Sequence, residues 1–152
     1  MVKIISTYGP LLLTAMGQTL LLALCGLFFG CILGIIFGLS SVVDNKVSRA
    51  ISAIYVNLIR GVPMIVLAFF VFFGVPYGLK NIFGIKYTLT ALQAGTVCLA
   101  LNCGAYMSEI IRAGIQSIDP GQMEAARSLG MSKAKTMIKV VLPQAKLKNL
   151  PI

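Results

Sequence analysis

The chain has 152 residues, of which 58% are hydrophobic and only 11% are charged, and its mean hydropathy is +0.93. Soluble domains are about 45–50% apolar and about 25% charged. A chain with so few charges could not cover a globular surface without large exposed apolar patches. The composition therefore argues against a soluble enzyme and against a free nucleic-acid-binding domain, and it favours a protein embedded in lipid.

The sequence offers little to a metal or to catalysis. It contains no His, which is the commonest general base and metal ligand. Its cysteines, Cys25, Cys31, Cys98 and Cys103, lie in apolar stretches without CxxC spacing, where Cys behaves as a small hydrophobe. No nucleophile–base arrangement is evident. We therefore expect no enzyme activity, no metal and no cofactor in this chain.

Three apolar stretches are long enough to cross a bilayer, which takes about 20 helical residues. We predict membrane spans at about 13–41, 53–76 and 87–111, with Gly61 and Pro63 lying where the second helix would start or kink. A short polar connection is expected between the second and third spans. It is marked by Pro76, Gly78, Lys80, Asn81, Gly84 and Lys86. The expected fold is an all-α, polytopic helical membrane protein.

The net charge of +9 is mostly a signal of topology. Basic residues of membrane proteins concentrate in cytoplasmic loops. If the first loop and everything after the third span share one side, that side carries ten basic residues against three on the other. The ten are Lys46, Arg49, Arg60, Arg112, Arg127, Lys133, Lys135, Lys139, Lys146 and Lys148; the three are Lys3, Lys80 and Lys86. This asymmetry predicts that the C-terminal segment is cytoplasmic and the N-terminus is outside.

Glycines recur every four residues in the first predicted span, at Gly26, Gly30, Gly34 and Gly38. Residues at this spacing form one stripe along a helix, and small residues let another helix backbone approach closely in lipid. We interpret the stripe as a helix-packing face rather than a ligand site.

Polar groups gather along one side of the third predicted span, where Asn102 lies roughly 15 Å from the basic end. Polar side chains at this depth usually face a bundle interior or an aqueous cavity, so Asn102 makes either an interhelical hydrogen bond or a substrate contact. Gln93, Gln18 and Thr19 are weaker substrate-pathway candidates nearer the other side. Glu109 and Arg112, three residues apart, predict a local ion pair.

The segment at about 113–145 predicts a pair of short helices on the basic side. Asp119 can cap the first and form a capping box with Gln122, and Gly130 supplies a left-handed stop. Ser132 can cap a second helix that Pro143 would end. Helices of about ten residues are unstable alone in water, so they must pack on something, and spacing alone leaves two alternatives open: a partner surface or anionic lipid.

Here the residues carry a resemblance to a known family. Glu124-Ala125-Ala126, followed by Gly130 and then by Leu142-Pro143, resembles the EAA loop of permease subunits of ABC importers. The longer string 105–131 is similar to the polar amino acid branch of that family, as are Arg60-Gly-Val-Pro63 and Gly17-Gln-Thr-Leu20. The match covers about residues 10–145, and this long ordered set of motifs is far more specific than an EAA triplet.

The resemblance implies a mechanism, a location and a set of partners. In that family the EAA segment is a coupling helix that docks on a separate ATP-binding subunit, whose closure drives alternating access. It implies docking roles for Glu124, Ala125, Ala126 and Gly130, with Arg127, Leu129 and Met131 extending the contact. It also implies a second permease subunit, an extracytoplasmic solute-binding protein and a multi-pass location in the inner membrane. This chain lacks a G-x-x-x-x-G-K-[ST] loop, so the ATPase must be another polypeptide.

The chain departs from the family pattern at its end. Relatives usually have about five spans, whereas this sequence stops at Ile152, and Lys146 interrupts the expected continuation. This predicts a truncated or frame-shifted copy, or an incomplete sequence. The alternative function is therefore a non-transporting membrane interaction protein that binds the ATPase.

Overall fold

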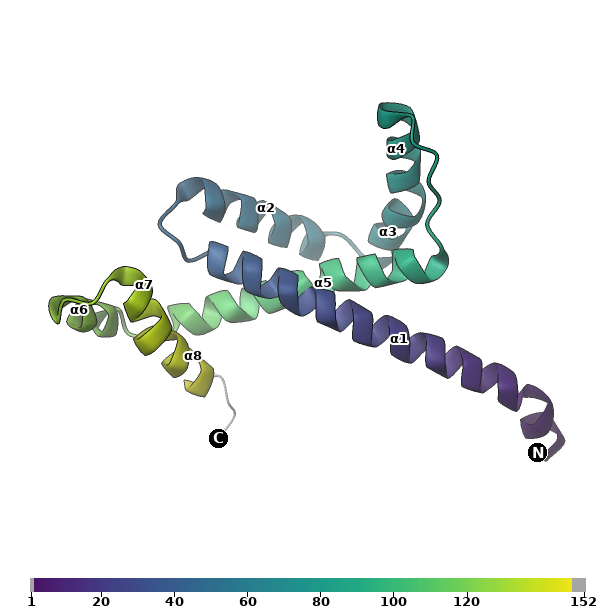
Figure 1. Cartoon of the computed structure of the whole chain (residues 1–152), viewed down its shortest axis with the longest axis horizontal. Coiled ribbons are helices and arrows are strands. Elements are labelled where there is room, and N and C mark those ends of the chain that lie inside the picture. Colours follow the sequence, from purple (N-terminus) through teal and green to yellow (C-terminus); the bar gives the residue numbers. More distant parts are fainter. Residues whose placement is uncertain (1, 149–152) are drawn as a thin grey trace.

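The computed structural model describes residues 2–148, and the side chains of residues 8–145. Within these residues all regular structure is helical, in three long helical segments and several short ones (Figure 1). In chain order the elements are α1 (Val2–Ser40), α2 (Lys46–Gly61), α3 (Met64–Phe69), η1 (Phe70–Gly74), α4 (Val75–Phe83), α5 (Ala91–Gln116), α6 (Pro120–Ser128), α7 (Lys133–Thr136), η2 (Met137–Val141) and α8 (Leu142–Lys148). The two η elements are π-helical turns. The predicted departure from the family pattern at residues 146–151 lies outside the residues whose side chains are described.

The closest helix pair is α1 with α5, and the predicted glycine stripe forms its contact face. A Cβ atom added at Gly30 would lie 2.8 Å from Cys103 Cβ, and one at Gly34 would lie 2.5 Å from Met107 Cβ. Gly26 and Gly38 approach Leu99 and Ile111 of α5 in the same way. The absence of side chains along this stripe lets the two backbones come into contact, as small residues do in membrane helices.

The chain breaks at residues 62–63, so the prediction of one continuous helix over 53–76 is wrong. Pro63 has no backbone N–H to continue the helix, and Val62 before it is extended (φ −102°, ψ 132°). The helix long and apolar enough to cross a membrane is Met64–Phe83, and α2 is a separate helix. It is tied to α1 by the Ser52 hydroxyl, which donates to the Phe37 carbonyl at 2.6 Å, and to α5 by the Tyr55 hydroxyl, which donates to the Leu101 carbonyl at 2.8 Å.

The other two candidate spans are Tyr8–Ser40 and Ala91–Gln116. The third therefore begins and ends later than the predicted 87–111. It begins where Thr90 caps α5: the Thr90 hydroxyl accepts from Gln93 N–H, and the Gln93 side chain accepts from Thr90 N–H. The predicted connection at 76–86 is also shorter than expected, because α4 continues to Phe83 and ends at Gly84 with positive φ (69°).

Two prolines that were expected to interrupt helices lie within them. Pro76 and Pro143 each follow a π-helical turn, in which the Val75 and Leu142 N–H groups bond to carbonyls five residues back. A proline ring normally clashes with the carbonyl four residues before it. The extra residue in the π turn shifts that carbonyl and relieves the clash. The predicted helix end at Pro143 is therefore wrong, and the helical segment runs on to Lys148.

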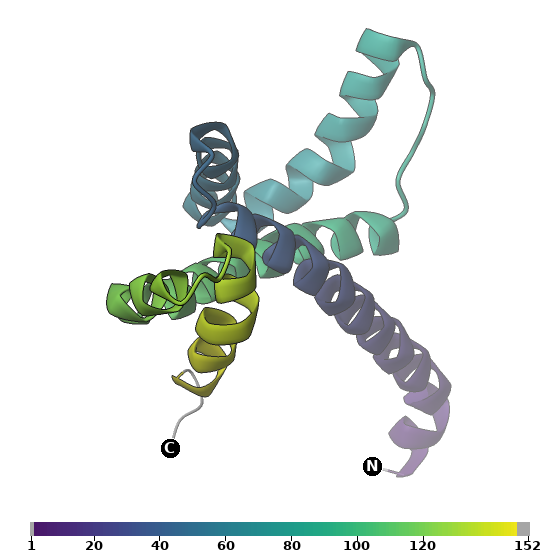
Figure 2. The ribbon, with the colours of Figure 1, turned by 60° about the vertical axis from the view of Figure 1, so that its left-hand side comes forward.

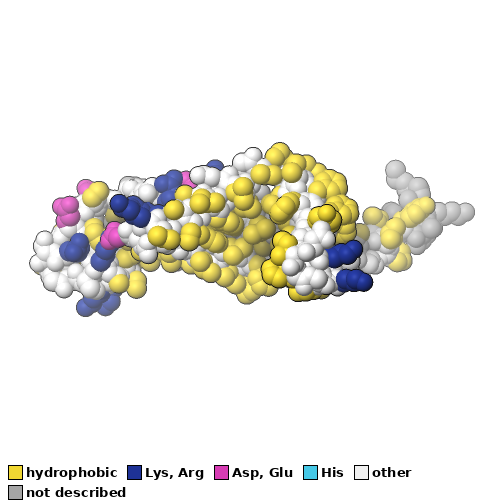
Figure 3. Space-filling model, turned by 90° about the horizontal axis from the view of Figure 1, so that it is seen from above, with side chains coloured by type: hydrophobic (Ala, Val, Ile, Leu, Met, Phe, Trp, Pro, Cys, Tyr) yellow, Lys and Arg dark blue, Asp and Glu magenta, His cyan; other side chains and the backbone are white. Residues whose placement is uncertain are grey.

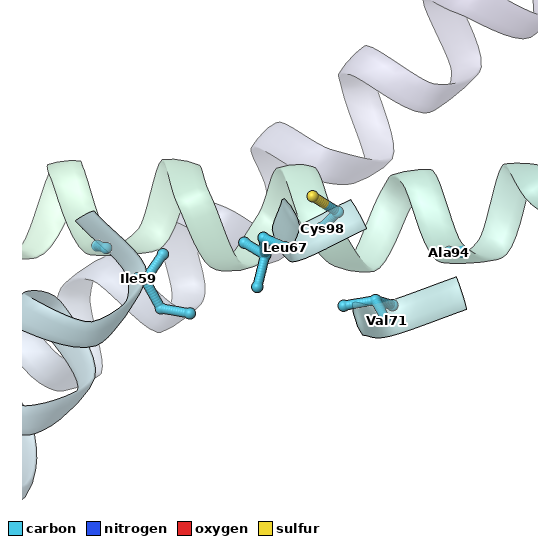
Figure 4. Close-up of a cluster of buried hydrophobic side chains, with 6 residues drawn as sticks. Ile59, Leu67, Val71, Ala94 and Cys98 are labelled. Carbon is cyan, nitrogen blue, oxygen red and sulfur yellow. The ribbon is translucent and has the colours of Figure 1, made fainter. Parts of the chain in front are cut away.

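The α5 helix is the centre of the packing. Cys98 and Ala105 of α5, both at most 1% exposed, pack with Ile59, Leu67 and Val71 from α2, α3 and η1 (Figure 4). At the other end of α5, Ile115 packs with Val141 and Ala145 of the C-terminal helices. Figures 1 and 2 show α3 and α4 pointing away from the α1–α5 pair, while α6–α8 cluster at the end far from the N-terminus. Large apolar side chains remain exposed along α1 and α3–α4, as expected for helices that face lipid or other helices.

Candidate functional site

The α6 helix begins and ends where local sequence signals place its boundaries. Asp119 accepts a hydrogen bond from Gly121 N–H at 2.8 Å, and Pro120 occupies the first helical position. At the other end Gly130 has φ 83°, its N–H donates to the Arg127 carbonyl, and Met131 N–H donates to the Ala126 carbonyl. These two bonds form a Schellman motif, the usual glycine-dependent helix stop. The predicted stop at Gly130 is confirmed.

Gln122 does not complete the predicted capping box. Its side-chain oxygen instead accepts a hydrogen bond from Gln144 Nε2 of α8 at 3.3 Å, while the Asp119 carboxylate bonds to Gly121. The side chain that was expected to close the start of α6 therefore links α6 to the last described helix.

Two further contacts hold the C-terminal helices against the membrane helices. Met123 of α6 and Met137 of η2 pack against the cluster of Ile115, Val141 and Ala145. Lys133 at the start of α7 forms an ion pair with Asp44, which lies in the turn between α1 and α2. The hydrogen bond from the Lys133 ammonium, and then its charge, lower the pKa of the exposed Asp44 carboxyl below its ordinary value. Residues 120–130 are thus supported from both ends of the segment that follows them.

The residues expected to dock on a partner divide into an exposed set and a supporting set. Glu124, Ala125, Arg127 and Gly130 are exposed, and the side chain of Leu129 is 86% exposed at the tip of the turn. Ala126 is 7% exposed and faces the chain itself, and Met131 is half-buried. Of the two alanines expected to let a partner approach, only Ala125 is therefore on the free surface.

The four substrate-pathway candidates do not converge on one site. Asn102 lines an open cavity of about 480 Å³ with Arg60, Tyr106 and the backbone at Pro63. Gln18 and Thr19 line a different cavity, of about 430 Å³, between α1 and the start of α5. Gln93 is exposed and is occupied in capping α5. Of these residues, only Asn102 lies among other polar groups.

A polar cavity that the sequence did not reveal lies between α2 and α5 and includes the Glu109–Arg112 pair. The predicted ion pair is present: Arg112 Nε donates to Glu109 Oε2 at 3.1 Å, and a second bond joins the same two side chains. Arg112 also donates to Gln116 Oε1 at 2.8 Å. The Arg60 guanidinium lies over the Tyr106 ring, 5.1 Å from its centre. Arg49, Arg60 and Arg112 come together because α2 is a separate helix lying on α5, which the prediction of a span over 53–76 did not include.

Polar and apolar side chains are segregated along the molecule. Figure 3 shows apolar side chains over the middle of the visible face, while most of the charged ones gather at the end that carries the C-terminal helices. The chain has the form of an apolar helical body with a charged end from which α6 projects (Figure 1).

Comparison with protein families identifies this architecture. The family model for the "Binding-protein-dependent transport system inner membrane component" matches residues 26–152. The chain belongs to this family. It is therefore a multi-pass membrane protein, and the resemblance in the EAA string and its neighbouring motifs is confirmed at the level of the family.

Relatives of this inner-membrane component are described as amino acid permeases. The chain is 37% identical to a putative glutamine transport system permease protein of Rickettsia bellii over 87% of its own length, and 39% identical to a probable amino-acid ABC transporter permease protein of Vibrio harveyi over 93%. A solved structure described as an amino acid ABC transporter with histidines superposes with a TM-score of 0.77 at 37% identity, covering 93% of this chain and 63% of that one. The chain spans about three fifths of the length of the curated relatives, 57% and 62% in these two cases.

Proposed function

We propose that this chain is the transmembrane permease subunit of an ATP-driven importer of polar amino acids. In this proposal it lies in the inner membrane with α6–α8 in the cytoplasm. It acts with a separate ATP-binding subunit, a second permease subunit and an extracytoplasmic solute-binding protein. ATP hydrolysis by the partner is coupled through α6 to alternating access between the membrane helices. Family membership and the descriptions of the relatives support this proposal.

The observation that carries the proposal is the presentation of α6. Its outer face exposes Glu124, Ala125 and Arg127, and Leu129 is almost fully exposed. Its inner face is fixed by Ala126, by the Gln122–Gln144 bond and by the Schellman motif at Gly130. An exposed apolar side chain on a rigid turn is costly to leave in water and is typical of the anchor of a protein interface. The turn is thus built to transmit force to α5, which ends only three residues before α6 begins.

The test is retention of an ATP-binding subunit from an amino acid importer of the same organism by the detergent-solubilised full chain. Glu124→Lys and Leu129→Ala should each lower retention at least tenfold, because interface anchors contribute more than 1.4 kcal/mol. Ile138→Ala is the matched control, since Ile138 is also an exposed apolar residue (65%) but lies outside α6 and its turn. Equal retention by all four proteins would contradict the docking role. Retention without substrate-stimulated ATP hydrolysis would instead favour a non-transporting interaction protein.

A further inference from the structure

The cavity between α2 and α5 has a volume of about 420 Å³ and is lined mainly by polar side chains. Arg49, Asn57 and Arg60 reach it from α2, and Glu109, Arg112 and Gln116 reach it from α5. Ser52 and Ser108, each 1% exposed, lie beneath these longer side chains. The cavity is thus a built feature between two packed helices rather than a scatter of surface charges.

Positive charge exceeds negative charge in this cavity. Three guanidinium groups face one carboxylate, and that carboxylate, on Glu109, is already bonded twice by Arg112. Arg49 and Arg60 form no ion pair within the described part of the chain. Arg60 is positioned over the Tyr106 ring, and the second face of its guanidinium and its N–H groups stay available. Planar guanidinium groups bind oxyanions with several N–H donors at once, so the cavity is suited to an oxyanion.

The position of the cavity indicates where this oxyanion comes from. Arg49 lies in the first turn of α2 and Gln116 is the last residue of α5, so the cavity opens at the charged end of the molecule. A neighbouring face of α2 exposes apolar side chains to the surroundings. They are Val47, Ile51, Ile54 and Leu58, each 55–66% exposed. A phospholipid combines the two chemistries, a phosphate for the arginines and acyl chains for the apolar face, whereas a free phosphate uses only the first.

We propose that this cavity binds the phosphate headgroup of an anionic phospholipid of the cytoplasmic leaflet. This rests on the proposed orientation, in which the charged end faces the cytoplasm. Basic pockets between membrane helices on that side are suited to anionic headgroups. Arg49 and Arg60 bind the phosphate oxygens, Asn57 and Gln116 add amide donors, and Glu109 limits the excess of positive charge.

The test is native mass spectrometry of the full chain in mixed micelles that contain phosphatidylglycerol or phosphatidylcholine. The wild-type chain should retain one phosphatidylglycerol and little phosphatidylcholine. Arg49→Gln and Arg60→Gln should each weaken retention of phosphatidylglycerol about tenfold, since each removes charge-assisted hydrogen bonds. Lys135→Gln, which removes an exposed charge near the same end but outside the cavity, should change it less than twofold. A loss in Lys135→Gln equal to that in the arginine variants would overturn the site.

A variant of opposite sign keeps the proposal testable even if an arginine variant misfolds. Glu109→Gln removes the carboxylate, keeps the side-chain shape and frees Arg112 donors, so retention of phosphatidylglycerol should rise severalfold. A decrease would overturn the proposal. Inorganic phosphate and glutamine are added separately as competitors, and displacement of the lipid by either one at micromolar concentration would show a soluble-anion or substrate site instead. Retention of the ATP-binding subunit, measured on the same variants, separates failure of this site from failure of the proposed function.

Discussion

Replacing Gly34 by Ala tests whether backbone contact between α1 and α5 holds the helices together. A Cβ atom at residue 34 would lie 2.5 Å from both Cβ and Cγ of Met107 and 3.3 Å from the Gly104 carbonyl oxygen, whereas ordinary van der Waals contact begins at 3.4 Å. Met107 Cβ is fixed to the backbone of α5 and cannot rotate away. The two helices must therefore move apart, and this weakens the packing contacts on which helix association in lipid depends.

The matched control is Gly17→Ala in the same helix, where a new Cβ meets nothing within 4 Å. Both substitutions change helix propensity in the same way, so the difference between the two variants isolates the cost of the contact. Overpacking of this kind costs about 1–3 kcal/mol, so Gly34→Ala should be less stable than Gly17→Ala by that amount.

The assay is reversible unfolding of the full chain in mixed detergent micelles, followed by circular dichroism. The cost of Gly34→Ala should shrink in a Met107→Gly background, because that change removes both atoms in contact. If Gly34→Ala proves as stable as Gly17→Ala, or if Met107→Gly does not reduce its cost, close approach of the backbones does not hold this pair.

Two further predictions concern the support of α6, alongside those for its outer face and for the arginine cavity. Thr136 is fully buried, and its hydroxyl has no hydrogen-bond partner in the described part of the chain; Thr136→Val should therefore stabilise the fold by about 1 kcal/mol in the same unfolding assay, and a loss of stability would show that the hydroxyl is satisfied. The Lys133 ammonium lowers the pKa of Asp44 below 3.8, so the ion pair stabilises the folded chain above that pH and its contribution is lost as the pH falls through the lowered pKa. The difference in melting temperature between wild type and Asp44→Asn should then be constant from pH 8 to about pH 5 and vanish below the lowered pKa; a difference that already falls between pH 7 and pH 5 would contradict this assignment.

Features set by neighbouring residues could be predicted from the sequence. The glycine stripe follows from a four-residue period in one helix, the stop at Gly130 from the left-handed conformation that glycine adopts readily, and the Glu109–Arg112 pair from a three-residue spacing. Each depends on local geometry alone, and each is present in the structure.

Features set by packing between distant segments could not be predicted. Pro143 was expected to end a helix, but Val141 and Ala145 on either side of it pack into the cluster around Ile115, which holds the segment helical through a π turn. Apolar residues continue on both sides of Pro63, so a length criterion could not separate α2 from the span that follows. The arginine cavity depends on that separation, because Arg49 and Arg60 meet Arg112 only when α2 lies along α5.

The packing also explains how one short turn can act on the whole chain. The α5 helix runs without interruption from Ala91 to Gln116 and contacts α1, α2, α3, η1 and α8. The buried share is 33% in the most apolar part of α5, against 17% for α1 and 11% for Met64–Phe83, so α5 is the membrane helix most firmly held by the chain itself. Because α6 follows α5 after three residues and is also bonded to α8, a displacement of the exposed turn at Leu129 must reach α5 first. The glycine contact then passes it to α1, while α3 and α4, which rest on α5 through Leu67 and Val71, follow with the least resistance.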